Sequence, residues 1–176
     1  MSNRSEALAR RLEEGARALA NFAQELTDAQ WQQRMPGDGR RFGVIVDHVA
    51  NVYPIEIDLA LTVSRGSAVT GVTWTVVADL NAAHAAERDA VTKPEALAHL
   101  QRSSEAAAAA IRALDDHALD SAAPVSLYGD APVTCQFMLE DHAVRHSFHH
   151  LARLRRVLEQ STAQREQSEA VVVLMA

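Results

Sequence analysis

Four of the chain's eight histidines lie within one short segment near its C-terminal end: His142, His146, His149 and His150. His146 and His150 are four residues apart, and on an α-helix this spacing places two imidazoles on one face. Such a pair can chelate a single cation if a third ligand comes from another segment. His48, which lies within the apolar stripe of a different predicted helix, is the candidate for that third ligand.

Three neutral imidazoles would hold a divalent cation and leave coordination positions open, as catalytic rather than structural metal sites do. Imidazole ligands suit zinc, nickel, iron or copper, and manganese is also kept among the candidate divalent transition metals. The charge of such a cation makes a bound water or thiol lose its proton more easily. The histidine pattern therefore predicts activation of a water or a thiol.

A simpler interpretation of the histidines stays open. A histidine on an apolar helix face, such as His48, is commonly a core side chain, and an i, i+4 pair can be incidental. His84, His99 and His117 have no partner at ligand spacing, so we expect them to be ordinary structural residues. We expect His142 and His149, which lie further round their helix, to support the ligands or face solvent.

Other kinds of site find little support. The chain contains neither the His-Glu-x-x-His run of zinc proteases nor the Glu-x-x-His pair of di-iron bundles, and it has no glycine-rich phosphate loop. Cys135, the single cysteine, starts the last predicted helix about three turns before His146. We interpret it as a buried thiol. Redox sensing through an intermolecular disulfide at Cys135 is a third, weaker hypothesis.

The elements that must position these residues are helices. The chain has 176 residues, only seven glycines and five prolines, and 5% aromatic residues, which favours an all-α single domain over a sheet. Apolar residues recur at helical spacing over 5–27, 42–65, 75–89, 92–114 and 134–159. The four longer segments predict a four-helix bundle with one or two short extra helices. We assign residues 1–160 to this bundle and 161–176 to a C-terminal tail.

Two local features refine this assignment. In the helix over 42–65, the apolar stripe leaves Asp47, Asn51 and Asp58 on the outside, and Pro54 is expected to kink the helix. The segment 115–132, which contains Pro124, Gly129 and Pro132, is predicted to be a long connection with at most one helical turn. Long connections in compact domains are often functional.

Charge and composition limit the partners. The formal net charge is -6, so a general nucleic-acid surface is not expected. No signal core and no apolar run of spanning length is present, and one cysteine fits a reducing compartment. We therefore expect a cytoplasmic protein without membrane contact, a small-molecule substrate and a homodimer, in which the apolar run 171–175 is a candidate contact.

Two segments carry a resemblance to a known family. Residues 41–50, which include His48, and residues 146–154, which include His146 and His150, are similar to the histidine segments of the DinB-like (DinB/YfiT-like) metalloenzyme superfamily. This group includes mycothiol-dependent maleylpyruvate isomerase-like and thiol-dependent transferase relatives. The resemblance implies an up-down-down-up four-helix bundle with a divalent metal on His48, His146 and His150. Many relatives have a glutamine where this chain has Arg153.

Two functions compete at this point. The leading hypothesis is a metal-dependent transferase, isomerase or hydrolase in which the three-histidine cation activates a low-molecular-weight thiol or water toward a small electrophile. The alternative is a non-catalytic helical module that dimerises or binds a partner, with structural or vestigial histidines. Added nickel or zinc discriminates between them, because a ligand of the native state raises the melting temperature.

Overall fold

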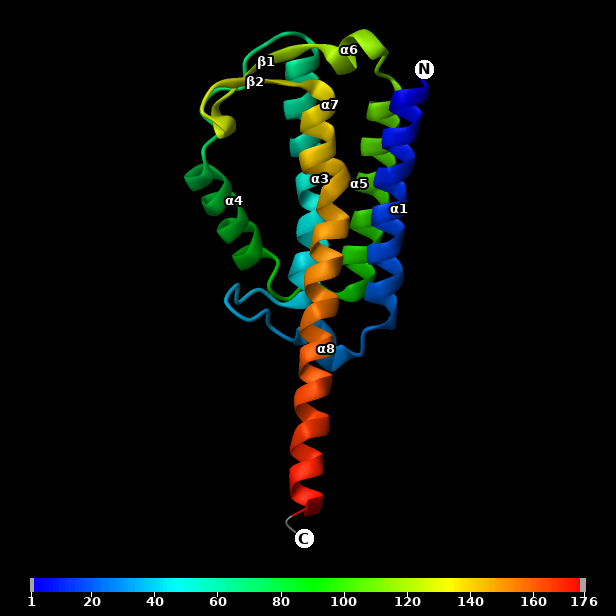
Figure 1. Ribbon diagram of the computed structural model, residues 1–176, viewed down its shortest axis with the longest axis vertical. Coiled ribbons are helices and arrows are strands. Elements are labelled where there is room, and N and C mark those ends of the chain that lie inside the picture. Colours follow the sequence, from blue (N-terminus) through cyan, green and yellow to red (C-terminus); the bar gives the residue numbers. More distant parts are fainter. Residues whose placement is uncertain (1, 175–176) are drawn as a thin grey trace.

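Four long helices form the body of the protein in a computed structural model, which describes the backbone of residues 2–174 and the side chains of 2–161 and 163. These helices are α1 (Asn3–Glu25), α3 (Phe42–Ser64), α5 (Lys93–Arg112) and α8 (Arg145–Leu174). The colours of Figure 1 show that α1 and α8 run in one direction and that α3 and α5 run in the other. The predicted up-down-down-up four-helix bundle is therefore confirmed.

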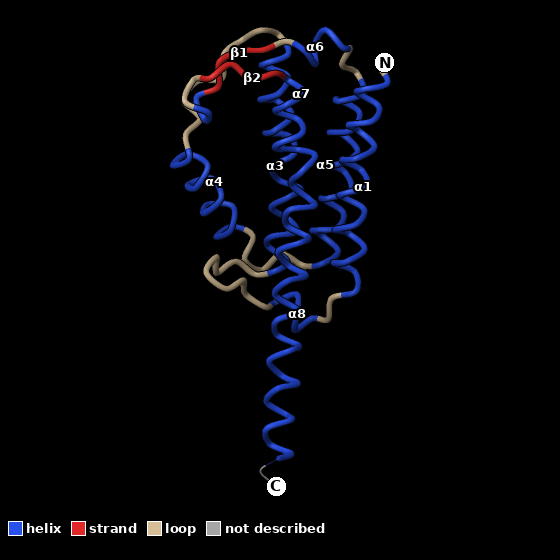
Figure 2. The backbone as a smooth tube through the Cα atoms, in the orientation of Figure 1, coloured by secondary structure: helices blue, strands red, loops and turns tan. Residues whose placement is uncertain are grey.

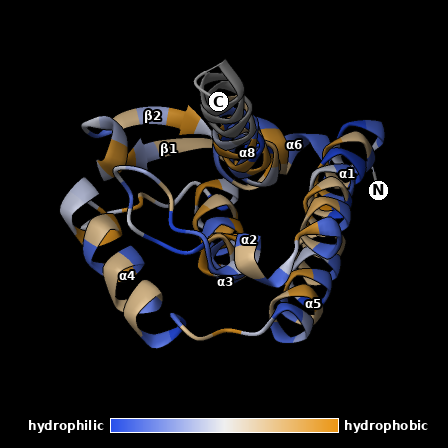
Figure 3. Ribbon diagram, turned by 90° about the horizontal axis from the view of Figure 1, so that it is seen from below, coloured by the Kyte–Doolittle hydropathy of each residue, from blue (hydrophilic) through white to orange (hydrophobic). Residues whose placement is uncertain are grey.

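A fifth helix, α4 (Trp74–Glu87), makes this order possible. Two successive bundle helices that run in the same direction need a long return connection, and α4 carries the chain back from the end of α3 to the start of α5. In the view along the bundle, α4 lies on the opposite side of α3 from α1 and α5 (Figure 3). The side chains of α4 line one side of a cavity that lies beside α3 and α8.

Local capping starts several helices where the sequence indicates. The side chain of Thr92 accepts a hydrogen bond from the amide of Glu95, and the Glu95 carboxylate accepts one from the Thr92 amide, which forms a capping box at the start of α5. A second box at Thr27 starts the short helix α2 (Asp28–Gln32). Trp31 of α2 packs on Gly43, where a Cβ would clash with the indole ring. Glycine therefore allows α2 to approach the first turn of α3.

The core is apolar and takes side chains from all four bundle helices. α3 supplies much of it, because most residues from Phe42 to Ala50 are buried. The helix continues through Pro54 without a break. Among the described residues, no helix is both long and apolar enough to cross a membrane.

The segment predicted as a long connection, 115–132, contains more structure than expected. It forms α6 (Asp116–Asp120) and a two-stranded antiparallel hairpin of β1 (Ala122–Val125) and β2 (Ala131–Thr134), with a 3-10 turn, η1 (Ser126–Tyr128), between them (Figure 2). Gly129 and Asp130 turn the chain with φ angles of 66° and 63°. The strands have four residues each and are rich in alanine and proline, so they carry no strand pattern.

The last predicted helix, 134–159, is not one regular helix. It consists of α7 (Cys135–Met138), a π-helical segment η2 (Leu139–Val144) and α8, which continues beyond the other helices to Leu174 (Figure 1). The division into a bundle over 1–160 and a tail over 161–176 stays a prediction, and the side chains of 171–175 lie outside the described residues. Cys135 is buried, and burial raises the pKa of its thiol to about 11.

Candidate metal centre

Three histidines from two helices meet beside the core. His48 comes from the first half of α3, and His146 and His150 come from successive turns of α8. One ring nitrogen of each lies within 4.8 Å of those of the other two. The Nε2 atoms of His48 and His146 are 3.2 Å apart. The structure thus brings together the three residues that the sequence indicated as ligands.

The environment keeps two of these imidazoles neutral. His48 and His150 are buried, whereas His146 is partly exposed. Burial, with a smaller contribution from the charge of His146, lowers the pKa of His48 to about 2 and also lowers that of His150 strongly. Neutral rings keep a nitrogen lone pair, which is the form that binds a metal.

Glu56 orients the third imidazole. Its Oε1 atom lies 2.7 Å from Nδ1 of His146, and the carboxylate is buried. Because a carboxylate accepts, Nδ1 of His146 carries the proton and donates, which leaves the lone pair on Nε2 facing the other two histidines. Carboxylates behind metal-bound histidines have this role. Sequence reasoning missed Glu56, although an acid between the apolar residues Ile55 and Ile57 was a signal.

The Nε2 atoms of His48 and His146 fit a cation, because they face each other at 3.2 Å. Nδ1 of His48, Nδ1 of His150 and Oε2 of Glu56 are buried without a hydrogen-bond partner among the described residues. The Nε2 lone pair of His146 can accept a hydrogen bond from His48, or the two nitrogens can share a cation. Only the second arrangement also uses the nearby ring nitrogen of His150. Three nitrogen donors at this separation suit a divalent transition metal.

His142 and His149 are not part of the convergent set. Nε2 of His142 lies 2.9 Å from the hydroxyl of Tyr128, which also donates to Asp141 at 2.7 Å. His142 Nδ1 is 4.0 Å from Glu56. It therefore packs behind the cluster, at the π-helical segment that precedes α8. His149 is exposed. The sequence analysis expects these two side chains to support the ligands or to face solvent, and their positions are compatible with that expectation.

Asp47 corrects the sequence analysis, which placed it on the outside of its helix. Its side chain is fully buried, with the ring of His84 at 3.1 Å, the ring of His99 at 2.9 Å and Nε of Arg88 at 2.9 Å. Burial opposes ionisation of Asp47, but the hydrogen bonds from His84, Arg88 and His99 outweigh it and hold the pKa of the carboxyl well below its usual range.

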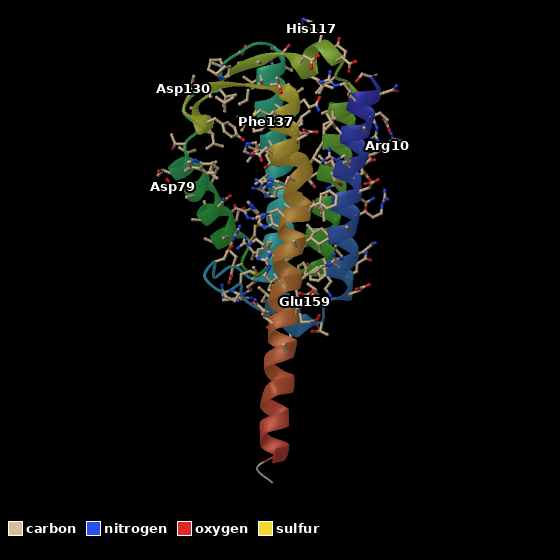
Figure 4. All side chains as sticks on the ribbon, in the orientation of Figure 1. Arg10, Asp79, His117, Asp130, Phe137 and Glu159 are labelled. Carbon is tan, nitrogen blue, oxygen red and sulfur yellow. The ribbon has the colours of Figure 1, made fainter. Side chains whose placement is uncertain are left out.

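His84 and His99 consequently do have a partner, which sequence spacing could not reveal because they come from α4 and α5. Together with Asp47 of α3, they join three helices immediately beside His48, whose ring centroid is 5.9 Å from that of His84. We call Asp47, His84, Arg88 and His99 the Asp47 cluster. His117 is exposed on α6, at the end of the molecule opposite the C-terminal end of α8 (Figure 4).

A cavity of about 350 Å³ opens onto the three histidines between α3, α8 and α4. Its walls are mostly apolar: Val52, Ile55 and Leu59 come from α3, and Trp74, Val77 and Leu80 come from α4. Polar and charged side chains line the rest of the cavity, among them Arg40, Asp141 and Arg145 as well as Glu56 and the histidines. On the other side of α4, Asp79 points away from the bundle (Figure 4). This combination of apolar walls and a few convergent polar groups is typical of small-molecule sites.

Comparisons with known proteins agree with this arrangement. The family model of the DinB superfamily matches residues 11–154. Among solved structures, the chain is similar to YfiT from Bacillus subtilis, described as "a probable metal-dependent hydrolase with an unusual four-helix bundle topology". The TM-score is 0.69 at 20% identity, and the match covers 92% of this chain and 90% of that one. No curated protein matches the chain significantly.

Proposed function

The chain belongs to the DinB superfamily, and we propose that it is a divalent-metal-dependent enzyme that activates a water or a low-molecular-weight thiol toward a small electrophile. The observation that carries this proposal is the convergence of one nitrogen each from His48, His146 and His150 within 4.8 Å. The cation is zinc, nickel, iron or manganese, all of which accept imidazole ligands.

Each residue of the site has a separate task. His48 and His150 supply lone pairs because burial keeps them neutral. His146 presents Nε2 because Glu56 holds the proton on Nδ1. When bound, the cation lowers the pKa of a coordinated water or thiol and so supplies a nucleophile near neutral pH. The apolar walls give an apolar electrophile a surface to pack on beside that nucleophile.

Water and a thiol are the two nucleophiles that the site can activate. A solved structure of the same fold is described as "a probable metal-dependent hydrolase", which favours water. The thiol-dependent relatives that the sequence resembles favour a thiol. Reaction of the metal-loaded protein with an activated ester, with and without an added low-molecular-weight thiol, distinguishes them by whether the product is the free acid or the thioester.

A metal titration tests the proposal directly. We expect zinc or nickel to raise the melting temperature of protein purified without a histidine tag, and we expect the shift to vanish in His48→Ala and His150→Ala. His149→Ala is the matched control on α8, because its ring is exposed and lies outside the convergent set; it should retain the shift. Equal shifts in wild type and His150→Ala would contradict the metal site and favour the non-catalytic module.

A further inference from the structure

Arg40 presents an unused donor at the edge of the cavity. Its Nε and Nη2 atoms donate to the two carboxylate oxygens of Asp38 at 2.6 Å and 2.8 Å, and Arg153 of α8 donates to the same carboxylate at 3.0 Å. Nη1 of Arg40 is buried and has no hydrogen-bond partner among the described residues. A buried donor on a cation costs free energy unless an acceptor meets it.

The position of Arg40 connects this donor to the metal centre. Arg40 lies two residues before α3 and lines the same cavity as His48 and His150. Its positive charge is among the causes that lower the pKa of both histidines, which places the guanidinium within electrostatic range of them. Asp38 holds it there, because its carboxylate occupies the Nε and Nη2 edge of the guanidinium and leaves Nη1 free, and Arg153 in turn donates to Asp38.

Two arginines line the cavity, Arg40 before the first turn of α3 and Arg145 at the start of α8. Arg145 pairs with Asp141 of η2, whose carboxylate also accepts a hydrogen bond from Tyr128. Glu56, which lies eight residues after His48 on α3, already contacts His146. Of the two arginines, Arg40 is the one with a buried nitrogen that has no hydrogen-bond partner among the described residues. An anionic ligand group therefore supplies the acceptor that this guanidinium lacks.

We propose that Arg40 binds the carboxylate of the substrate through Nη1, so that the substrate class is a small carboxylic acid with an apolar body. This inference rests on the proposed metal-dependent function, whose substrate it specifies. The carboxylate accepts the hydrogen bond that Nη1 lacks. The apolar body fills part of the 350 Å³ between Ile55 of α3 and Leu80 of α4. A guanidinium suits this task because its planar donors match a carboxylate.

Binding of two matched probes tests the inference without a turnover assay. Hexanoate and hexanamide have the same apolar chain, but only hexanoate carries a charge. We expect calorimetry on the zinc-loaded protein to show tighter binding of hexanoate, and Arg40→Gln to weaken it by about 10- to 100-fold, the range for losing a hydrogen bond to a charged group. Hexanamide binding should change little. Arg40→Lys, which keeps the charge, should retain part of the preference.

The role of Arg40 and the metal site are tested by different measurements. Equal affinity for hexanoate and hexanamide in wild type, or a preference that survives in Arg40→Gln, would overturn the role of Arg40. Zinc titration of wild type tests the proposed function separately. If zinc does not bind, the same pair of probes on the metal-free protein still decides the inference. If Arg40→Gln does not fold, the wild-type comparison and Arg40→Lys decide it.

Discussion

At the scale of single residues, the candidate centre depends on groups that are not ligands. Glu56 contacts only one of the three imidazoles, yet it determines which nitrogen of His146 faces the other two. A histidine without such a partner can present either nitrogen and can rotate about its side-chain bonds. The carboxylate removes this freedom before any cation binds, because it holds one tautomer and one ring orientation.

Replacing Glu56 by glutamine should therefore weaken metal binding without removing a ligand. We expect Glu56→Gln to lower the affinity for zinc by about 10- to 100-fold, the usual effect of losing such a carboxylate. A competitive titration against a zinc chelator measures it. Asp58→Asn is the control, because Asp58 is an exposed acid on the same helix. An unchanged zinc affinity in Glu56→Gln would show that Glu56 does not orient His146.

At the scale of elements, α4 is attached to the bundle chiefly near its C-terminal end. Most of its residues are exposed, including Trp74 and Leu80, and His84 is its buried residue. His84 and Arg88, which follows the helix, both contact Asp47. The Asp47 cluster thus holds the helix that walls the cavity and joins it to the turn of α3 that carries His48.

Removing the carboxylate of Asp47 should loosen α4 more than the rest of the bundle. We expect Asp47→Ala to lower the free energy of unfolding by about 3 kcal/mol, because it leaves buried partners without their acceptor. Amide hydrogen exchange should accelerate in residues 74–87 more than in α1. Asp79→Ala, on the exposed side of α4, should change neither quantity. Uniform acceleration across all helices would contradict a local role for the Asp47 cluster.

At the scale of the whole molecule, the buried histidines make stability depend on pH. The bundle contains His48 and His150 as neutral groups whose pKa is lowered from the ordinary histidine value of 6.5. In the unfolded chain both regain their ordinary pKa and bind protons as the pH falls below it. Since the unfolded state then binds more protons than the folded state, stability decreases with falling pH. Above about pH 7.5 the two states bind equally few protons at these sites.

The metal-free protein should consequently lose stability between pH 7.5 and 5.5. We expect His48 and His150 each to contribute a loss on the order of 1 kcal/mol at pH 5.5, measured by urea unfolding at both pH values. This window lies above the range in which carboxylates such as Asp47 titrate. The double variant His48→Gln, His150→Gln should show a smaller difference between the two pH values. If wild type and the double variant lose the same stability between the two pH values, these histidines do not cause the pH dependence.

Homodimer formation and the division at residue 160 stay predictions at this scale. The described apolar core extends to Leu158.

The sequence alone predicted where the four long helices lie and which three histidines form the candidate centre. Helical periodicity, the capping box at Thr92 and the spacing of His146 and His150 are local properties, and local patterns survive in the folded chain. The direction of each bundle helix came from a family resemblance. His48 was already the candidate third ligand from its place in the apolar stripe of another predicted helix, and the resemblance added the same assignment.

Only the tertiary structure decided how residues from separate elements meet. Asp47 had a polar side chain at an outward position of its helix, but His84 of α4, Arg88 directly after α4 and His99 of α5 cover that position and supply three hydrogen-bond partners. Glu56 likewise gains its role from His146, which is far away in the chain. Arg40 gains its role from a buried nitrogen that has no hydrogen-bond partner among the described residues. Periodicity records which face of a helix is apolar, whereas charge pairing across helices depends on their packing, which no local pattern encodes.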